Sequence, residues 1–325
     1  MRAAADVVDR ALELTVVPSF SRIGPSVRGR LEHWGHAEDL TGRVFVVTGA
    51  TSGIGLAAVR ALLAGGATVD LVARNAAKVG ALAADLADDA PGRVGTVVAD
   101  TGDLDAVRAA AATLSARRAR IHGLIHCAGA LDAEYATSPQ GIEQTVASQV
   151  VGPFLLTALL LPRLRAGASG TPGRVLFVAS GGMYTEPLDV DRLELRPDGY
   201  DGTTAYARAK RAQVTLAELW GARLDPAQVV VHAMHPGWVD TPGVARSLPT
   251  FRRVMGPLLR SPEEGADTLV WLSASDGAPL ASTGGFWLDR RRRTTHRLPS
   301  TRRADTAAAR AALWRWCEAR SGSTG

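Results

Sequence analysis

Short apolar runs alternate with longer alanine- and leucine-rich segments along most of the chain, from residue 42 onward. Each apolar run has the length of a buried strand, and each segment between two runs has the length of a helix. Strands that alternate with helices pair in parallel through right-handed crossovers, and the helices cover both faces of the sheet. The sequence therefore predicts one α/β, doubly wound domain with a mostly parallel, seven-stranded sheet. The expected strands are 44–47, 68–73, 94–99, 121–126, 174–179, 229–234 and 284–288.

Two segments lie outside this alternating pattern. Residues 1–41 form an extension in which 5–14 has helical spacing, and residues 304–325 contain a surface helix predicted over 307–320 and a tail. The extension can cover the core, pair subunits or lie on a membrane surface, and packing is favoured because no strongly basic amphipathic face is evident. We therefore expect an N-terminal helical extension over 1–41, the α/β domain over 42–303 and a C-terminal helix and tail over 304–325.

The composition excludes several classes of protein. Hydrophobic residues make up 46% of the 325 residues and charged residues 21%, so the chain can bury a core and is not disordered. The two cysteines, Cys127 and Cys317, are too few for a disulfide framework or a cysteine-based zinc site. His126 and His235 have no carboxylate at ligand spacing, so we predict no metal site.

Charge and hydropathy indicate neither a nucleic-acid partner nor a transmembrane segment. The net charge is +5, and because only Lys78 and Lys210 are lysines, the basic balance reflects a bias towards arginine. The run Arg290–Arg293 could touch phosphate or acidic lipid, but a solvated face is favoured because no aromatic residues accompany it. The apolar stretch at 154–161 is shorter than the ~18 residues that span a bilayer. No signal-peptide core follows Met1, so we expect a cytoplasmic protein.

A glycine-rich turn connects the first expected strand to the first helix. Its three glycines allow a sharp turn, close approach of the backbone to a pyrophosphate and tight packing of helix on sheet. The amides and dipole at the start of the helix favour a negative group there. A plain strand–helix turn is the alternative, but dinucleotide binding requires this strand–turn–helix context, so we predict a Rossmann-type nucleotide site. The predicted phosphate-binding residues are Gly49, Thr51, Ser52, Gly53, Ile54 and Gly55.

The end of the second expected strand indicates which dinucleotide binds. NAD-specific sites place a carboxylate there to hold the ribose 2′-hydroxyl, but Ala73 stands at this position and is followed by Arg74 and Asn75. Asp70 lies too early in the strand to replace that carboxylate. A guanidinium would pair with a 2′-phosphate, so we predict that NADP(H) is the preferred cofactor and that NAD(H) is possible. The alternative is that Arg74 is a solvated residue at the helix entry.

Tyr206 and Lys210 are four residues apart, so on a helix they share one face. A tyrosine has a pKa of about 10 in water, and a nearby ammonium favours the phenolate and lowers that pKa. Ser180 ends an expected strand, and its hydroxyl can donate to a carbonyl oxygen. Lysine at position 210 is notable in a chain that otherwise uses arginine, which cannot readily lose its charge. The sequence therefore predicts a catalytic group of Ser180, Tyr206 and Lys210.

These motifs resemble those of the short-chain dehydrogenase/reductase family over residues 42–290. The turn at 48–55, Ser180, the Tyr206–Lys210 pair and the step Pro236-Gly237 with Thr241 match the family's pattern. Further short motifs, such as 180–183 and 234–238, resemble the member 12 subgroup of that family. The resemblance implies that the cofactor also contacts Asp100, Thr101, Cys127, Ala128, Gly129, Tyr206, Lys210, Pro236, Gly237, Val239 and Thr241.

Two positions depart from the family's pattern. The family's Asn-Asn-Ala-Gly after the fourth strand is His126-Cys127-Ala128-Gly129 in this chain. We expect Cys127 to be a small buried filler and not a nucleophile, because no base is placed for it. Gln149 stands where the family has an asparagine that holds a water of the proton relay. Gln149 can act as the fourth catalytic residue from a shifted position, or it can fail to do so.

The resemblance implies an oxidoreductase that transfers a hydride between nicotinamide and a carbonyl or alcohol carbon. Ser180 would polarise the oxygen, Tyr206 would exchange its proton as general acid/base, Lys210 would lower the pKa of Tyr206 and Gln149 would relay protons. We expect reduction of a ketone or aldehyde. Two long loops carry apolar residues, with Met183 and Trp238 as expected substrate contacts, so a lipophilic small molecule is predicted. The alternative is that these loops pack on the core.

Two other classes of function stay open. The departures at 127 and 149 allow a catalytically weak or silent NADP-binding module with a regulatory or partner-binding role. Residues 1–35 allow a protein that lies on a membrane surface. The resemblance also implies a homo-oligomer, a dimer or tetramer that pairs through the helices at 142–164 and 205–221.

Overall fold

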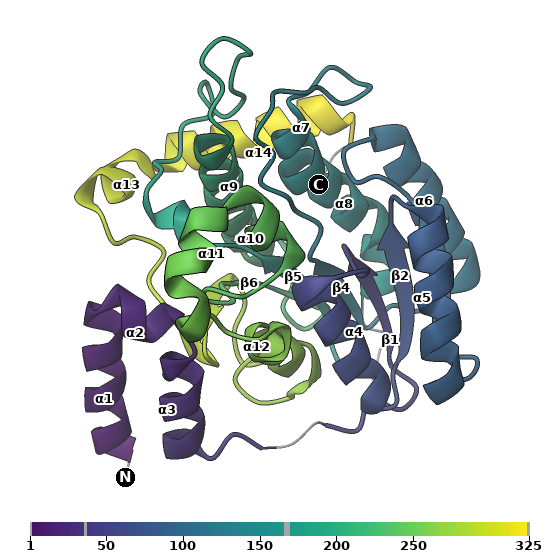
Figure 1. The fold of residues 1–325 in the computed structure, drawn as a ribbon. Coiled ribbons are helices and arrows are strands. Elements are labelled where there is room, and N and C mark those ends of the chain that lie inside the picture. The colour runs from purple at the N-terminus through teal and green to yellow at the C-terminus, as the bar shows by residue number, and fades with distance from the viewer. Residues whose placement is uncertain (1, 36–37, 166–169, 324–325) are drawn as a thin grey trace.

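The structure is a computed structural model that describes residues 2–35, 38–165 and 170–323. One sheet in the order β3-β2-β1-β4-β5-β6-β7-β8 runs through the molecule, with helices on both faces (Figure 1). Seven strands pair in parallel, which confirms the doubly wound fold. They are β1 (Val44–Thr48), β2 (Thr68–Ala73), β3 (Val94–Val98), β4 (Gly123–His126), β5 (Gly173–Val178), β6 (Val229–Met234) and β7 (Gly285–Leu288).

An eighth strand, β8 (Arg291–Arg292), is the difference from the seven that we expected. It pairs antiparallel with β7 after a two-residue turn at Asp289 and Arg290, whose φ angles are 52° and 55°. Such turns favour glycine or asparagine because both central residues are left-handed. The sequence therefore carries no usual hairpin signal here, and buried arginine partners of Asp289 hold the turn instead.

Two hydrophobic clusters fill the space on opposite faces of the sheet. Alternate residues of β1 point to opposite faces, so Phe45 and Val47 join one cluster and Val46 joins the other. Residues of α4 (Gly53–Ala64), α5 (Ala76–Asp89) and α12 (Pro262–Ala274) complete the first cluster. Residues of α6 (Leu104–Arg117), α8 (Gly152–Leu164) and α9 (Gly202–Arg223) complete the second.

The segment expected as one helix over 142–164 is interrupted. It consists of α7 (Gln144–Val146), a π-helical turn η1 (Ala147–Val151) and α8. Within the described residues, 144–164 is the one helix long and apolar enough to cross a membrane, and most of it is buried inside the protein. Because π-helical turns widen a helix and often occur at functional sites, the turn is notable for containing Gln149.

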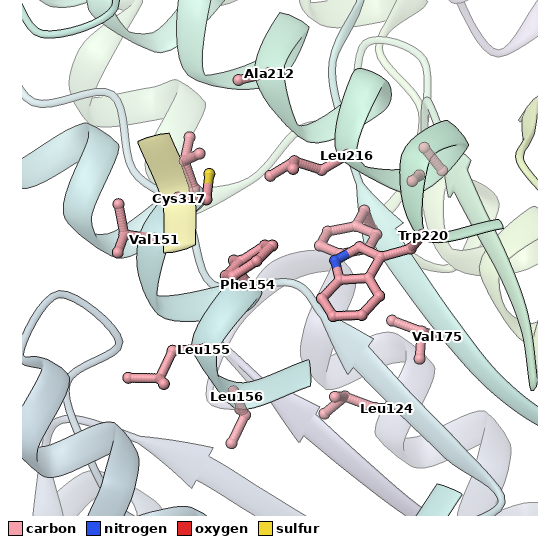
Figure 2. Packing of buried hydrophobic residues seen from close by; sticks show 14 of the residues in the cluster. Leu124, Val151, Phe154, Leu155, Leu156, Val175, Ala212, Leu216, Trp220 and Cys317 are labelled. Atoms are coloured by element: carbon pink, nitrogen blue, oxygen red, sulfur yellow. The ribbon is translucent and has the colours of Figure 1, made fainter. Parts of the chain in front are cut away.

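The C-terminal helix α14 (Ala307–Ser321) covers α8 and α9. The Trp314 ring lies 5.1 Å from the ring of Phe154 and 4.7 Å from that of Trp220, between ring centroids. Figure 2 shows Cys317 of α14 beside Phe154, and the cysteine is completely buried. The helices expected to pair subunits are therefore already covered on this face by the chain itself. The homo-oligomer and its pairing through these helices stay predictions, and the face that α14 covers is not available for that pairing.

The N-terminal extension folds into α1 (Arg2–Leu14), α2 (Val16–Phe20) and α3 (Ile23–Glu32), which lie together at one side of the molecule (Figure 1). Ion pairs of Arg291 join α1 and α3 to β8. Asp289 is buried and accepts hydrogen bonds from Arg28 of α3 and from both terminal nitrogens of Arg260. The Arg260 bonds are 2.6 and 3.0 Å long, which is a bidentate pair. A buried ion-pair cluster thus joins the extension to the rest of the chain.

The arginine run at 290–293 is not a solvated face, which corrects our favoured interpretation. Arg290 pairs with Asp267, Arg291 pairs with Asp6 of α1, and Arg293 pairs with Asp9, with nitrogen–oxygen distances of 2.6 to 2.8 Å. Burial would raise the pKa of Asp9, but Arg293 and Arg28 lower it to about 2. Three of the four arginines therefore hold acidic side chains of other segments.

Several short elements carry no clear pattern in the sequence and were not predicted. Besides α2 and α3, they lie in the loops that follow β5, β6 and β8. They are η2 (Gly181–Tyr184), α10 (Pro242–Ser247), α11 (Pro249–Met255), η3 (Gly256–Leu258) and α13 (Pro299–Ala304).

We predict that Trp314→Ala lowers the free energy of unfolding by about 3 kcal/mol, because it leaves a cavity against Phe154 and Trp220. Chemical denaturation of the variant and of the parent protein measures the difference. Arg315→Ala, one position along the same helix on its exposed side, serves as the control. Equal losses for the two variants would show that α14 does not stabilise the core.

Candidate active site

Three loops meet at the carboxyl ends of β1, β4 and β6. Gly49 has φ of 65°, and a Cβ added there would lie 2.7 Å from the backbone of Ala128. A Cβ on Gly53 would lie 3.1 Å from the Thr241 side chain. The predicted cofactor residues of the turn, of 127–129 and of 236–241 are therefore brought together.

The turn after β1 has the features that a phosphate group requires. A Cβ on Gly55 would lie 2.3 Å from the Gly49 carbonyl oxygen, so only glycine fits this close packing of helix against turn. Ser52 is the N-cap of α4 and its side chain forms no capping hydrogen bond, while Thr51 and Ile54 are half-buried beside it. The first amides of α4 thus remain free to bind an anion, and the residues present fit a dinucleotide pyrophosphate.

The next loops place the residues predicted to contact the adenosine half. Arg74 is exposed at the end of β2, and Asn75 caps α5 by accepting a 2.8 Å hydrogen bond from the Lys78 amide. Asp70 is buried and pairs with Arg117 and with Arg118, so it cannot hold a ribose.

Beyond β3, Asp100 is half-buried and accepts a hydrogen bond from the Gly102 amide, while Thr101 is buried. A Cβ on Gly152 of α8 would lie 1.9 Å from the Thr101 carbonyl oxygen, so this loop packs closely against the helix.

The side chains of Ser180 and Tyr206 lie close enough that Ser180 lowers the pKa of the Tyr206 phenol. Ser180 follows β5 and its oxygen also accepts the Gly182 amide at 3.3 Å. Tyr206 lies in the first turns of α9, a helix that begins where Asp201 caps the Thr203 amide. The strand end and the helix start therefore position two hydroxyl groups beside each other.

The pKa of Tyr206 is raised, because burial of the phenol outweighs the hydrogen bond with Ser180. Burial also lowers the pKa of Lys210 to about 7. The Lys210 nitrogen lies 5.2 Å from the centroid of the Tyr206 ring, and the pKa of the phenol is nevertheless raised. Our expectation that Lys210 brings this pKa towards neutrality is therefore corrected. Tyr206 keeps its proton at neutral pH and can donate it.

Lys210 is held by an arrangement that the sequence analysis missed. Its Nζ donates to the Val178 carbonyl and to Oε1 of Gln213, both at 2.9 Å. Nε2 of Gln213 in turn donates to the backbone carbonyl of Gln149 at 2.6 Å. Gln213 is buried three residues after Lys210, and this spacing on one helix face is the signal that could have identified it.

Gln149 lies buried in the π-helical turn, where its Nε2 donates to the Ala130 carbonyl at 2.7 Å. Its Oε1 is buried and has no hydrogen-bond partner among the described residues. A Cβ added to Gly129 would lie 3.0 Å from this Oε1 and 3.2 Å from the Lys210 nitrogen. The two groups therefore border the same space, and an unpaired buried acceptor there is suited to hold a water.

Three other predicted site residues differ in how far they are exposed. Burial raises the pKa of Cys127 to about 12, which fits the interpretation as a filler and not that of a nucleophile. Met183 is completely buried within the core, so the structure corrects the prediction that it contacts substrate. Trp238 is half-buried between the rings of Phe20 and Phe251, at centroid distances of 5.8 and 5.4 Å.

The extension reaches the site through Phe20, which the sequence analysis also missed. The Phe20 carbonyl accepts the Trp238 amide at 2.7 Å, and its ring lies 4.4 Å from the His235 ring. A Cβ on Gly181 would lie 2.9 Å from the Phe20 ring. α2 thus supports both the segment after Ser180 and the loop after β6.

The rest of the loop after β6 is fixed by the backbone. Gly237 has φ of 80°, and a Cβ there would lie 2.2 Å from the Arg260 side chain, so glycine is required. Pro236 and Val239 are buried, and Thr241 caps α10 by accepting the Val244 amide at 3.2 Å. Within the described part of the chain, no three His, Cys, Asp or Glu side chains gather as metal ligands.

Comparisons with known proteins agree with this geometry. The family model for short chain dehydrogenases matches residues 43–190. Human dehydrogenase/reductase SDR family member 12 is 34% identical over 259 residues, which are 79% of this chain and 80% of that protein. A Streptomyces protein named as a daunorubicin C-13 ketoreductase is 34% identical over 269 residues, with 82% of this chain and 88% of that protein covered.

A solved structure extends the likeness to the whole fold. The crystal structure of an uncharacterized protein from Mycobacterium paratuberculosis is 26% identical, covers 89% of this chain and 96% of its own, and has a TM-score of 0.70. The likeness to member 12 also confirms the subgroup that the short motifs indicated. The chain belongs to the short-chain dehydrogenase/reductase family and is an NAD(P)-dependent oxidoreductase.

Proposed function

We propose that this protein uses NADPH to reduce a carbonyl group of a lipophilic small molecule, with Tyr206 as the general acid. The observation that carries the proposal is the contact between the Tyr206 and Ser180 hydroxyls, with a raised pKa that keeps Tyr206 protonated. When a carbonyl carbon accepts a hydride, negative charge develops on the carbonyl oxygen, which then needs hydrogen-bond donors and a proton. When bound, the nicotinamide supplies the hydride.

Each residue of the group then has a distinct role. The Ser180 hydroxyl donates to the carbonyl oxygen and polarises it, and Tyr206 transfers its proton to that oxygen as charge develops. The Lys210 ammonium has three protons and donates to two acceptors. Like Oε1 of Gln149, it borders the space beside Gly129. A water in that space would link Lys210 to Gln149 and could return a proton towards the site. Gln149 thus serves from a shifted position, which is the first of the two alternatives left open by the sequence.

The preference for NADP(H) is supported by Arg74. Its side chain is exposed at the end of β2 and forms no ion pair with any described residue, so it is free to bind a 2′-phosphate. The neighbouring Asp70 is neutralised by Arg117 and Arg118 and offers no carboxylate to a ribose hydroxyl.

A lipophilic substrate is supported by the loop after β6. In α10 and α11 no residue is buried, and the half-buried rings of Trp238 and Phe251 meet there. In such sheets ligands bind beyond the carboxyl ends of the strands. Apolar side chains at that place therefore suit an apolar ligand. The name of the Streptomyces relative, a daunorubicin C-13 ketoreductase, also supports reduction of a carbonyl group.

We predict that Tyr206→Phe slows NADPH-dependent reduction of ketones and aldehydes by about a hundredfold or more, because it removes the proton donor. Binding of NADPH, followed by fluorescence, should persist. Tyr135→Phe, which alters a half-buried tyrosine outside the group, should leave turnover unchanged. Binding without turnover in the parent protein as well would favour the catalytically silent NADP-binding module.

We predict that Arg74→Ala weakens binding of NADPH about tenfold or more, because a charge-assisted contact to the 2′-phosphate is lost. Binding of NADH should change little. Arg60→Ala removes an arginine of α4 that pairs with Asp85, and it controls for the change in net charge. Equal losses for NADPH and NADH would contradict the role of Arg74.

The pH dependence of reduction should follow Lys210, since Tyr206 stays protonated through the neutral range. The rate should fall as pH rises through about 7, where the Lys210 ammonium loses its proton. Gln213→Glu places a carboxylate beside the ammonium and should move this fall to higher pH, because an opposite charge raises the pKa of a lysine. In Gln213→Leu, the pH at which the rate falls should not rise. A folded Gln213→Glu variant with the parent profile would contradict control by Lys210.

A further inference from the structure

The outer face of the N-terminal extension carries exposed apolar side chains. On α1, Val7, Ala11 and Leu14 are spaced by four and three residues, so they form one stripe. Val7 is 68% exposed and Leu14 is 86% exposed. Isolated exposed leucines are common, but a stripe on one helix face marks an interaction surface.

The other two helices continue this surface. On α3, Ile23, Val27 and Leu31 are four residues apart and so also share one side of the helix, and Ile23 and Leu31 are each about two-fifths exposed. Between the two helices, α2 exposes Val16 and Val17. We call these residues together the outer face: Val7, Ala11, Leu14, Val16, Val17, Ile23, Val27 and Leu31.

The two stripes point the same way. Arg291 of β8 pairs with Asp6 on the inner side of α1 and with Glu32 on the inner side of α3. Because both inner sides converge on one arginine, both outer sides turn away from β8. Figure 1 shows α1 at the outer edge of the molecule with α3 next to it.

The charges of the extension are sorted between its two sides. The acidic residues of α1 and α3 all pair with arginines on the inner side: Asp6, Asp9, Glu13 and Glu32. Arg10, Arg22 and Arg30 are exposed and form no ion pair with another described residue. On the three helices of the extension, the apolar outer face is therefore accompanied by unpaired arginines, although their sequence contains both signs of charge. This corrects our expectation that the extension has no basic amphipathic face.

We propose that the outer face docks on an anionic lipid surface. Apolar side chains of amphipathic helices insert at the level of the headgroups, and unpaired arginines bind the anionic groups around them. A second copy of the chain fits less well, because pairing this face with itself would oppose arginine with arginine. The exposed residues are also aliphatic, whereas protein interfaces are enriched in aromatic residues and methionine.

Docking would bring the candidate active site close to the lipid surface. Phe20 ends α2, whose Val16 and Val17 lie on the outer face, and the same residue supports the loop after β6. The proposal rests on the surface alone and goes beyond the proposed reaction.

Flotation of the full chain with vesicles tests the proposal. The protein should float with vesicles of phosphatidylcholine mixed with phosphatidylglycerol, and much less with phosphatidylcholine alone or at high salt. The double variant Val7→Asp/Leu14→Asp should lower the partition coefficient at least about tenfold, because it removes inserted apolar groups and adds negative charge. Each of Arg10→Ala, Arg22→Ala and Arg30→Ala should lower it by about fivefold.

Matched controls lie far from the outer face. Val98→Asp changes an exposed valine on β3, the opposite edge of the sheet, and Arg196→Ala removes an exposed arginine of a loop. Both controls should float like the parent protein. Reduction of a water-soluble ketone should be the same in all variants, so loss of flotation is separable from failure of the proposed reaction.

Two results would overturn the proposal. The first is absence of flotation with anionic vesicles, or equal flotation of Val7→Asp/Leu14→Asp and Val98→Asp. The second is a vesicle-free dimer that Val7→Asp/Leu14→Asp dissociates in sedimentation experiments, which would assign the outer face to a second copy.

Discussion

The parallel direction of the strands places the carboxyl ends of β1, β4, β5 and β6 at one edge of the sheet. The glycine turn, the 127–129 loop, Ser180 and the 236–241 loop each follow one of these ends. Groups that are far apart in the sequence therefore meet without a long irregular segment. The helix α9 then only has to cross this edge to bring Tyr206 against Ser180 and Lys210 against Val178.

Asp289 adds a second constraint, because it joins three distant parts of the chain. It holds Arg28 of the extension and Arg260, and Arg260 also donates to the carbonyls of residues 19–21 and packs against Gly237. Removing one partner of such a buried pair leaves an uncompensated charge. The extension is thus tied to the loop over 236–241, which is expected to contact the cofactor. The same inward pairing of acidic residues leaves basic and apolar side chains on the outer face.

The sequence predicted what is encoded locally. Glycine spacing, the four-residue step from Tyr206 to Lys210 and the alternation of strands and helices each depend on neighbouring residues. Long-range pairing could not be predicted. Arg291 and Asp6 are 285 residues apart, and no residue near either one indicates which partner it has. The expected direction of the Tyr206 pKa shift was wrong because burial, which raises this pKa, is a property of the folded chain. Gln213 was missed because glutamine on a helix is common and is usually exposed.

The proposed function depends on Ser180 and Tyr206 serving hydride transfer to a carbonyl carbon. The most direct measurement uses NADPH that carries deuterium at the transferable position of its nicotinamide ring, with mass spectrometry of the products from a series of lipophilic ketones. We expect one deuterium on the new alcohol carbon of at least one product. Bound NADPH that keeps its deuterium with every ketone and aldehyde supplied would contradict it.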